Sequence, residues 1–377
     1  MPLTTDQIFL LGLFLFWIIL YALSLIAHTD KHGLKIFPFF LMYRSERFKN
    51  TISRIGQKNS LLWKTLGNIS TALGLGLLIY VTYFLVGNLV KFFTSASQSV
   101  PITPIIPAVT ISLDSLPYFF VAVAIIVVLH ELAHGVGAIS EKVPVKSAGL
   151  AVMLAFFGGF VEPEEQGFEK TSKTSKLRIL SAGSAINLVT GILVLVLMLS
   201  MFAPSSGVLI EGTLANGPLA NHGVTRFEVI YAINGTPIES VENLSNYLSK
   251  VKPGETLTVD VNHNNITLVT ENLTGRAVIG VSPAINYYPL RFYSNPVVSA
   301  NVFLTFYWTY VAAFSVAIFN MLPAVPFDGD KFLYSLLEDR VQKNRRVLLH
   351  VLINAIFWGL LLANFVLSFV HFGLPQV

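Results

Sequence analysis

The sequence contains no cysteine and few charged residues, and both absences limit what the protein can be. Without cysteine the chain cannot form disulfides, thiolate zinc sites or iron–sulfur clusters, and it has no cysteine nucleophile. Any metal must therefore be held by His, Asp or Glu. Charged residues make up 12% of the 377 residues, against about 25% in soluble domains. This composition excludes a cytosolic enzyme of two standard domains.

Apolar residues are concentrated in six runs, and each is long enough to cross a membrane. A helix needs about 20 apolar residues to span the hydrocarbon core of a bilayer. We therefore expect a polytopic α-helical membrane protein with spans near Ile8–Ala27, Ile69–Val90, Tyr118–Val136, Ile179–Met201, Val297–Leu322 and Leu348–Val370. The first run is interpreted as a retained span, because no Lys or Arg precedes it and it is longer than the apolar region of a signal peptide.

Positive charge is distributed unevenly among the connections between these runs. Nineteen of the 25 Lys and Arg residues lie between spans one and two, three and four, and five and six. Lys and Arg are enriched in cytosolic loops, so we expect these connections in the cytosol and both termini outside it. The net charge of +4 is then a signal of topology, and nucleic acid is not an expected partner.

A polar insert lies between the fourth and fifth runs, from about Gly207 to Pro283. Its pattern predicts a strand ending at an Asn234-Gly235 turn, a helix over Ser240–Val251 and a half-buried strand over Thr256–Val261. This order resembles a small α+β PDZ-like domain, a module that binds an extended chain by strand addition. A β-rich plug without a ligand is the alternative. The topology above makes this insert extracytoplasmic.

The third run ends in the sequence HELAHG, which holds His130, Glu131 and His134. Residues four apart lie on one face of a helix, so both imidazoles can reach one metal ion. Glu131 is then close enough to take a proton from water on that metal. Unpaired His and Glu are costly within a membrane. This location favours a metal site over two histidines hydrogen-bonded inside a helix bundle.

Asp328 is the candidate for a third metal ligand, since a catalytic zinc takes three protein ligands and leaves one position open. Pro323 and Pro326 are expected to end the fifth helix, and Gly329 lets the chain pass closely by a ligand. Two weaker rivals are Asp330 and His350. The alternative is a solvated Asp328 that caps an interfacial helix.

HELAHG in one span and the pattern N-x-x-P-x-x-x-x-D-G after a later one together resemble the site-2 proteases, which are intramembrane zinc metalloproteases. The matching residues are His130, Glu131, His134, Asn320, Pro323, Asp328 and Gly329. Ser181–Asn187 resembles the family's A-G-P-x-x-N element, with Ser184 where proline is usual. The resemblance extends from about Tyr118 to Val370. The lack of cysteine in a chain of this length favours a microbial source, and among microbes an archaeal one.

The resemblance implies a role for each matching position. His130, His134 and Asp328 would ligate one Zn²⁺ per chain, with Glu131 as general base and then acid. Asn187 and Asn320 would hold the substrate or the oxyanion. The segment Met153–Glu165 is similar to a membrane-associated hairpin of the family, in which Gly158 and Gly159 suit an edge strand beside an unwound substrate. A plain amphipathic loop is the alternative, and Glu162 is a side chain that could be mistaken for a ligand.

Four parts are expected along the chain. Residues 1–116 hold two accessory spans and a basic cytosolic loop, 117–203 and 295–377 the two halves of the core membrane domain, and 206–284 the PDZ-like domain. The implied protein is a multi-pass cell-membrane endopeptidase that cleaves in or near the transmembrane helix of single-span membrane protein substrates. Its active site would lie near the cytosolic side of the lipid bilayer and be reached through a polar cleft.

The outward domain would either exclude bulky ectodomains or recognise substrates already trimmed by an upstream protease. Three other classes of protein remain as alternatives. Another membrane zinc peptidase, such as a prenyl-protein protease, is disfavoured because those proteins lack an outward PDZ-like insert and take a third ligand from a different motif. A catalytically silent membrane scaffold is disfavoured by the intact set of ligands and base. An ion-coupled transporter is disfavoured because the two halves of the sequence show no internal repeat.

Overall fold

The computed structural model describes residues 5–27, 33–106, 109–154 and 156–373. The start of the first basic connection, His28 to His32, and Ala155 of the predicted hairpin lie outside these residues. The chain divides into two compact units, one formed by residues 1–192 and 308–377 and the other by residues 193–307. Each unit is described by itself below.

Six helices among the described residues are long and apolar enough to cross a membrane, and they fall on the six predicted runs. They are α1 (Thr5–Ala27), α3 (Ser60–Thr94), α4 (Leu116–Ser140), α6 (Lys173–Met201), α9 (Pro296–Phe319) and α11 (Lys343–Phe372). The prediction of a polytopic α-helical protein is confirmed to this extent. Helix α9 ends before the predicted Leu322, because the ring of Pro323 would clash with the carbonyl group of Phe319 in a continued helix.

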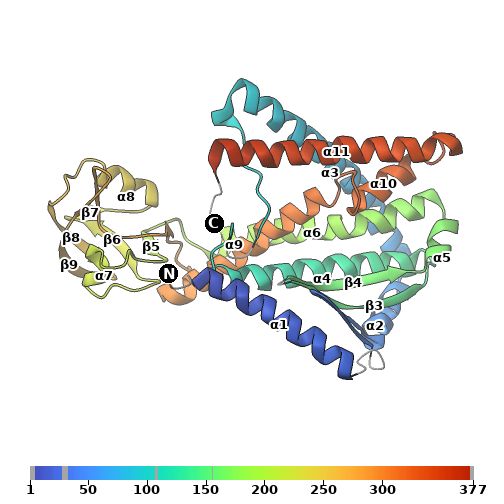
Figure 1. Ribbon diagram of the computed structural model, residues 1–377, viewed down its shortest axis with the longest axis horizontal. Coiled ribbons are helices and arrows are strands. Elements are labelled where there is room, and N and C mark those ends of the chain that lie inside the picture. The colour runs from blue at the N-terminus through green and yellow to red at the C-terminus, as the bar shows by residue number, and fades with distance from the viewer. Residues whose placement is uncertain (1–4, 28–32, 107–108, 155, 374–377) are drawn as a thin grey trace. The chain divides into compact units, whose positions relative to one another are not determined.

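The first unit also contains a four-stranded antiparallel sheet with the strand order β1-β2-β3-β4. Its strands are β1 (Leu34–Phe37), β2 (Phe40–Arg44), β3 (Val145–Met153) and β4 (Phe156–Pro163). Strands β3 and β4 form the predicted hairpin, and β4 is an edge strand that packs along α4 (Figure 1). Strands β1 and β2 come from the connection after the first span and were not predicted.

The region before α4 is packed into this unit at several points. Helix α2 (Glu46–Gln57) lies against α4 and β3, and Ile52 is fully buried there with Val136 of α4. The indole Nε1 of Trp17 in α1 donates to the carbonyl oxygen of Leu154 at 2.8 Å. The first span and α2 are therefore joined to the hairpin, and α3 packs against α4 and α11.

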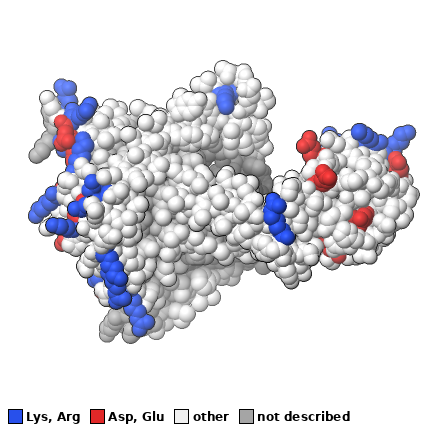
Figure 2. All heavy atoms as spheres, turned by 180° about the vertical axis from the view of Figure 1, so that it is seen from behind, with Lys and Arg blue, Asp and Glu red and all other residues white. Residues whose placement is uncertain are grey.

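The remaining helices among the described residues of this unit are short: η2 (Ala96–Gln98), α5 (Glu165–Lys170) and α10 (Asp328–Leu337). Lys and Arg side chains gather at one end of the unit, where α2, α5 and the connection from α10 to α11 lie (Figures 1 and 2). Ion pairs such as Lys176–Glu338, at 3.0 Å, and Arg178–Glu141, at 2.8 Å, tie the helices together at this end.

The second unit contains the polar insert as a small α+β domain. Its helices are α7 (Pro218–Asn221) and α8 (Val241–Leu248), and its strands are β5 (Val208–Ile210), β6 (Val229–Ile233), β7 (Thr236–Pro237), β8 (Thr256–Val261), β9 (Asn264–Val269), β10 (Glu271–Leu273), β11 (Arg276–Val278) and β12 (Ala284–Asn286). The main sheet has the order β12-β5-β6-β8-β9, and β7 pairs with β6.

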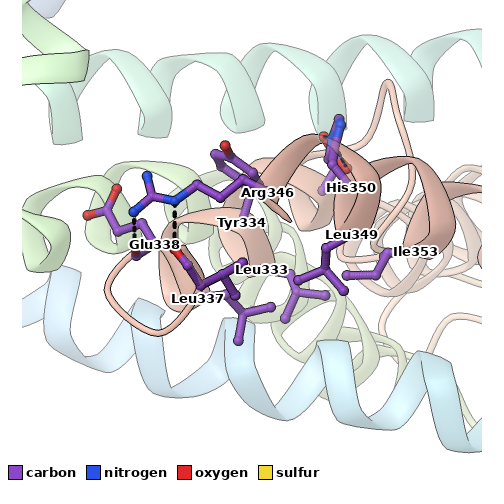
Figure 3. A pocket seen from close by; sticks show the side chains of 10 residues that line it. Leu333, Tyr334, Leu337, Glu338, Arg346, Leu349, His350 and Ile353 are labelled. Carbon is purple, nitrogen blue, oxygen red and sulfur yellow. Dashed lines mark hydrogen bonds and ion pairs between the residues drawn. The ribbon is translucent and has the colours of Figure 1, made fainter. Parts of the chain in front are cut away.

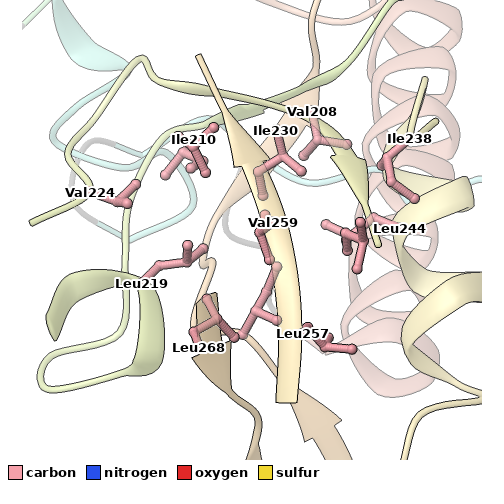
Figure 4. Close-up of a cluster of buried hydrophobic side chains, with 13 residues drawn as sticks. Val208, Ile210, Leu219, Val224, Ile230, Ile238, Leu244, Leu257, Val259 and Leu268 are labelled. Carbon is pink, nitrogen blue, oxygen red and sulfur yellow. The ribbon is translucent and has the colours of Figure 1, made fainter. Parts of the chain in front are cut away.

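The larger of two apolar clusters in this unit forms the core of the domain. Side chains from the strands and from α8, including Val208, Ile230, Leu244 and Val259, point into one interior (Figure 4). Asn234 and Gly235 both have positive φ, as a two-residue hairpin turn requires, and β8 has the predicted bounds. Helix α8 begins after Ser240, whose side chain accepts from the backbone N–H of Asn243.

Candidate metal centre

Three predicted ligands come together in the first unit. The Nε2 atoms of His130 and His134, one turn apart on α4, lie 3.1 and 3.0 Å from Oδ2 of Asp328, the first residue of α10. The two Nε2 atoms are 3.0 Å apart, and both imidazoles are buried, with 5% and 9% of each residue exposed. One nitrogen from each His and one carboxylate oxygen thus converge within 4.8 Å of one another.

The contacts behind the two imidazoles orient them as metal ligands. Nδ1 of His134 lies 2.7 Å from the carbonyl oxygen of Ile179, so Nδ1 carries the hydrogen and Nε2 directs its lone pair at the centre. Nδ1 of His130 lies 3.0 Å from the side-chain amide nitrogen of Asn187. Oδ1 of Asn187 is buried and has no hydrogen-bond partner among the described residues.

A turned Asn187 amide removes this unpaired oxygen. The orientation of an amide is assigned from its hydrogen bonds, and a rotation of 180° lets Oδ1 accept from Nδ1–H of His130. Both Nε2 lone pairs then point at the same space as the carboxylate of Asp328. Two neutral imidazoles and one carboxylate fit the donor set of a catalytic zinc.

Close packing by α6 keeps the two imidazoles in place. A Cβ atom added to Gly183 would overlap the Nε2 atoms of both His130 and His134. Only a glycine at this position lets α6 lie so near the centre. The sequence element around Gly183 was recognised, but its contact with the ligands was not, because the spacing within α6 carries no information about α4.

The segment between α9 and α10 brings Asp328 to the centre. The backbone N–H of Gly329 donates to the carbonyl oxygen of Asn320 at 2.8 Å, and a Cβ on Gly329 would overlap the backbone of Met321. Gly329 was expected to allow close passage by a ligand, but it allows the chain to cross itself. Nδ2 of Asn320 lies 2.9 Å from Nε2 of His130 and 3.1 Å from Oδ2 of Asp328.

Glu131 lies between the centre and the edge strand. Its Oε2 accepts from the backbone N–H of Val161 in β4 at 2.9 Å. A Cβ on Gly159 would be in ordinary contact with the side chain of Glu131, at 3.5 Å, whereas one on Gly158 would press against Val127 of α4. The predicted base is thus held by the hairpin that was predicted to receive the substrate.

A cavity of about 810 Å³ opens beside the centre, and Glu131, His134 and Asp328 form part of its wall. Glu162, Lys176 and Glu338 are among the charged residues that line the rest. A cavity with so many ionic side chains admits water, which agrees with the predicted polar cleft.

The rival ligands are occupied elsewhere. Asp330 and His350 pair with each other, at 2.8 Å, and Figure 3 shows His350 beside a small pocket next to α10. Glu162 accepts hydrogen bonds from Lys146 and Ser147, both at 2.7 Å, and these contacts lower the pKa of its carboxyl group. None of the three belongs to the converging group of ligands.

Comparison with known proteins gives matches to the same region. The profile of Peptidase family M50 matches residues 118–364. An uncharacterized protein of Methanocaldococcus jannaschii is 28% identical over 338 residues, which cover 87% of this chain and 85% of that protein. A membrane-bound transcription factor site-2 protease homolog of Arabidopsis thaliana is 29% identical over 140 residues, covering 36% of this chain and 27% of that protein.

The insert has a structural neighbour in the PDZ domain of an SdrC-like protein from Listeria monocytogenes. That domain is 17% identical, covers 21% of this chain and 90% of its own chain, and has a TM-score of 0.20. A likeness at this TM-score does not establish a shared fold. The M50 match, by contrast, covers more than half of the chain and includes all three converging ligands. The chain therefore belongs to peptidase family M50, the family of the site-2 proteases, which are membrane-embedded zinc metalloproteases.

Proposed function

We propose that the protein is an intramembrane zinc endopeptidase that hydrolyses a peptide bond in or near the transmembrane helix of a membrane-anchored substrate. The observation that carries this proposal is the convergence of His130, His134 and Asp328 at the wall of a water-admitting cavity, beside Glu131. A silent scaffold would not need all four groups.

His130, His134 and Asp328 would hold one zinc ion, through Nε2, Nε2 and a carboxylate oxygen. When bound, zinc supplies Lewis acidity, which acidifies water and polarises the carbonyl group of a peptide bond. Three protein ligands leave one coordination position open for this chemistry. The buried contacts of Nδ1 with Ile179 and Asn187 hold both imidazoles with Nε2 directed at the centre.

Glu131 would take the proton from the attacking water and return it to the leaving amine. Its Oε2 atom is held by the N–H of Val161, which leaves Oε1 as the proton acceptor. The cavity beside Glu131 supplies the water that hydrocarbon lacks.

The two asparagines would act differently from each other. Asn187 is fully buried behind His130, so it would orient that imidazole, and we do not place it on the substrate. Asn320 is half-buried beside the ligands, with Nδ2 near both His130 and Asp328. With both ligand atoms engaged by a metal ion, Nδ2 would be released to donate to the oxyanion that forms at the scissile carbonyl.

The substrate would pair with β4. A transmembrane helix hides its carbonyl groups in its own hydrogen bonds, so it must unwind before cleavage. Edge strand β4, with Gly158 and Gly159 at its centre, offers backbone groups to an extended chain by strand addition. The N–H of Val161 points away from β3, since it donates to Glu131.

The orientation proposed for the chain follows the positive charge. The basic end of the first unit (Figure 2) would face the cytosol, with the termini and the insert outside. The PDZ-like insert would then exclude bulky ectodomains or bind substrates already trimmed by an upstream protease.

The proposal is tested with purified protein in liposomes that contain a single-span model helix with a helix-breaking Asn-Pro pair. Glu131→Gln should abolish cleavage while the zinc content per chain stays unchanged, because Gln accepts no proton but is not a ligand. Asp328→Asn should lower the zinc content. Full turnover in the first variant, or a full zinc load in the second, would contradict the assignments.

A further inference from the structure

Helix α11 presents three polar side chains in a single stripe toward the segment that carries Asp328. His350, Asn354 and Trp358 are spaced by four residues and so lie on one face of the helix. All three side chains make hydrogen bonds with residues 325–330, and nothing in the sequence motifs of the metal site includes them. Apart from its first turns, the rest of α11 is largely apolar.

His350 and Asn354, the first two residues of the stripe, hold Asp330. Nε2 of His350 lies 2.8 Å from Oδ1 of Asp330, and Nδ2 of Asn354 donates to the same oxygen at 2.8 Å. Asp330 is only 7% exposed. A buried carboxylate is costly unless it is hydrogen-bonded, so these donors fix Asp330, two residues after the ligand Asp328.

Asn354, which also binds Asp330, and Trp358 hold the loop that leads into α10. Oδ1 of Asn354 accepts from the backbone N–H of Val325 at 2.7 Å, and Nε1 of Trp358 donates to the carbonyl oxygen of Val325 at 3.0 Å. Both backbone groups of one residue are thus held by α11. Asn354 connects the loop to Asp330, because its amide binds both.

The start of α10 is also held by contacts other than those of the stripe. Phe327, the N-cap residue, makes no side-chain capping bond. On the other side of the loop the chain is pinned by its crossing at Gly329 and by the apolar contacts of Leu322 and Ala324 with Val81 and Leu85 of α3. The position of the Asp328 carboxylate therefore depends on contacts from α11 and α3.

We propose that His350, Asn354 and Trp358 are positioning residues, which set the geometry of the metal ligand Asp328 through Asp330 and Val325. The proposal rests on the proposed function, because it concerns the same zinc site. None of the three side chains touches the reacting atoms. Partners that orient metal ligands typically contribute about 10- to 100-fold to metal affinity. The stripe acts through one further residue, so we expect the lower figure.

The test compares two Asn→Leu substitutions on the same helix. Asn364 is also buried, and its amide donates to the carbonyl oxygen of Leu85 in α3 and accepts from Asn88, so its hydrogen bonds go to α3 and not to residues 325–330. Zinc affinity is measured by competition with a coloured chelator, and thermal unfolding is measured on the metal-free proteins. Asn354→Leu should weaken zinc binding about tenfold and lower kcat with KM unchanged. Asn364→Leu should lower the unfolding temperature and leave zinc affinity unchanged.

Three further variants keep the test decisive if Asn354→Leu does not fold. His350→Gln retains a donor for Asp330 and should keep zinc affinity within about twofold of the unmutated protein, while His350→Leu should lose about tenfold. Trp358→Phe removes one hydrogen bond and keeps a ring beside Phe327, and it should weaken zinc binding.

The outcomes separate this inference from the proposed function. Unchanged zinc affinity in the folded variants of His350, Asn354 and Trp358 would overturn the inference, and so would an equal loss in Asn354→Leu and Asn364→Leu. The proposed function would stand in both cases if Asp328→Asn loses its zinc while the unmutated protein binds it. An unmutated protein that binds no zinc would overturn the proposed function itself.

Discussion

The residues that support the metal site either leave room for the two imidazoles or form hydrogen bonds with the ring nitrogens that point away from the centre. Gly183 leaves room for both imidazoles, and Ile179 and Asn187 hold them from behind. The ligands themselves could be predicted from the sequence, because the spacing of His130 and His134 on one helix is a local signal. The supporting residues could not, since their contacts join positions 45 and 57 residues apart.

Gly183→Ala tests the close approach of α6. The added methyl group would overlap His130 and His134, and overpacking of this kind costs about 1–3 kcal/mol. We expect the zinc content and the cleavage rate to fall by at least about tenfold, with the loss of zinc measured on folded protein. Gly76→Ala in α3 is the matched control, because nothing lies within 4 Å of its added Cβ. Equal zinc contents in the two variants would contradict this account.

Among the elements, the hairpin illustrates what local pattern can and cannot provide. Gly158-Gly159 and the alternation around them predicted an edge strand, and β4 is one. The pairing of β2 with β3 joins Phe40 to Met153. Such long-range pairing leaves no mark in the two short apolar stretches that form β1 and β2. For the same reason, the sequence analysis singled out only His350 from the stripe on α11, and interpreted it as a rival ligand.

Val161→Pro tests the hydrogen bond by which β4 holds the proposed base Glu131. Proline is tolerated on an edge strand where the N–H points outward, so the unfolding temperature should change little. Loss of this N–H removes the donor that holds Oε2 of Glu131, and a hydrogen bond to a charged group contributes about 1.5–3 kcal/mol. We expect kcat/KM to fall by about tenfold or more. Val161→Ala keeps the N–H, so it serves as the control, and a folded proline variant with full activity would argue against this support of Glu131.

At the scale of the whole molecule, charge predicts an orientation that the fold alone does not define. The absence of cysteine makes this orientation measurable, because a single introduced cysteine can be labelled without background. Lys250→Cys in the insert should react with a membrane-impermeant maleimide on intact cells. Lys58→Cys, between α2 and α3, should react only after the membrane is opened. The reverse pattern would invert the proposed topology, and the unmutated chain provides the blank.

The sheet of the first unit has one further consequence for the whole chain. Strand β2 pairs with β3 residue by residue from Phe40 with Met153 to Arg44 with Gly149, so the segment before α4 covers a strand of the M50-matched region. A shortened protein that began at α4 would lack β1 and β2. Strand β3 would then be an open edge of the sheet, in addition to the open edge at β4. Exposed strand edges recruit other chains. Such a truncated protease should therefore self-associate instead of behaving as a minimal active version of the enzyme.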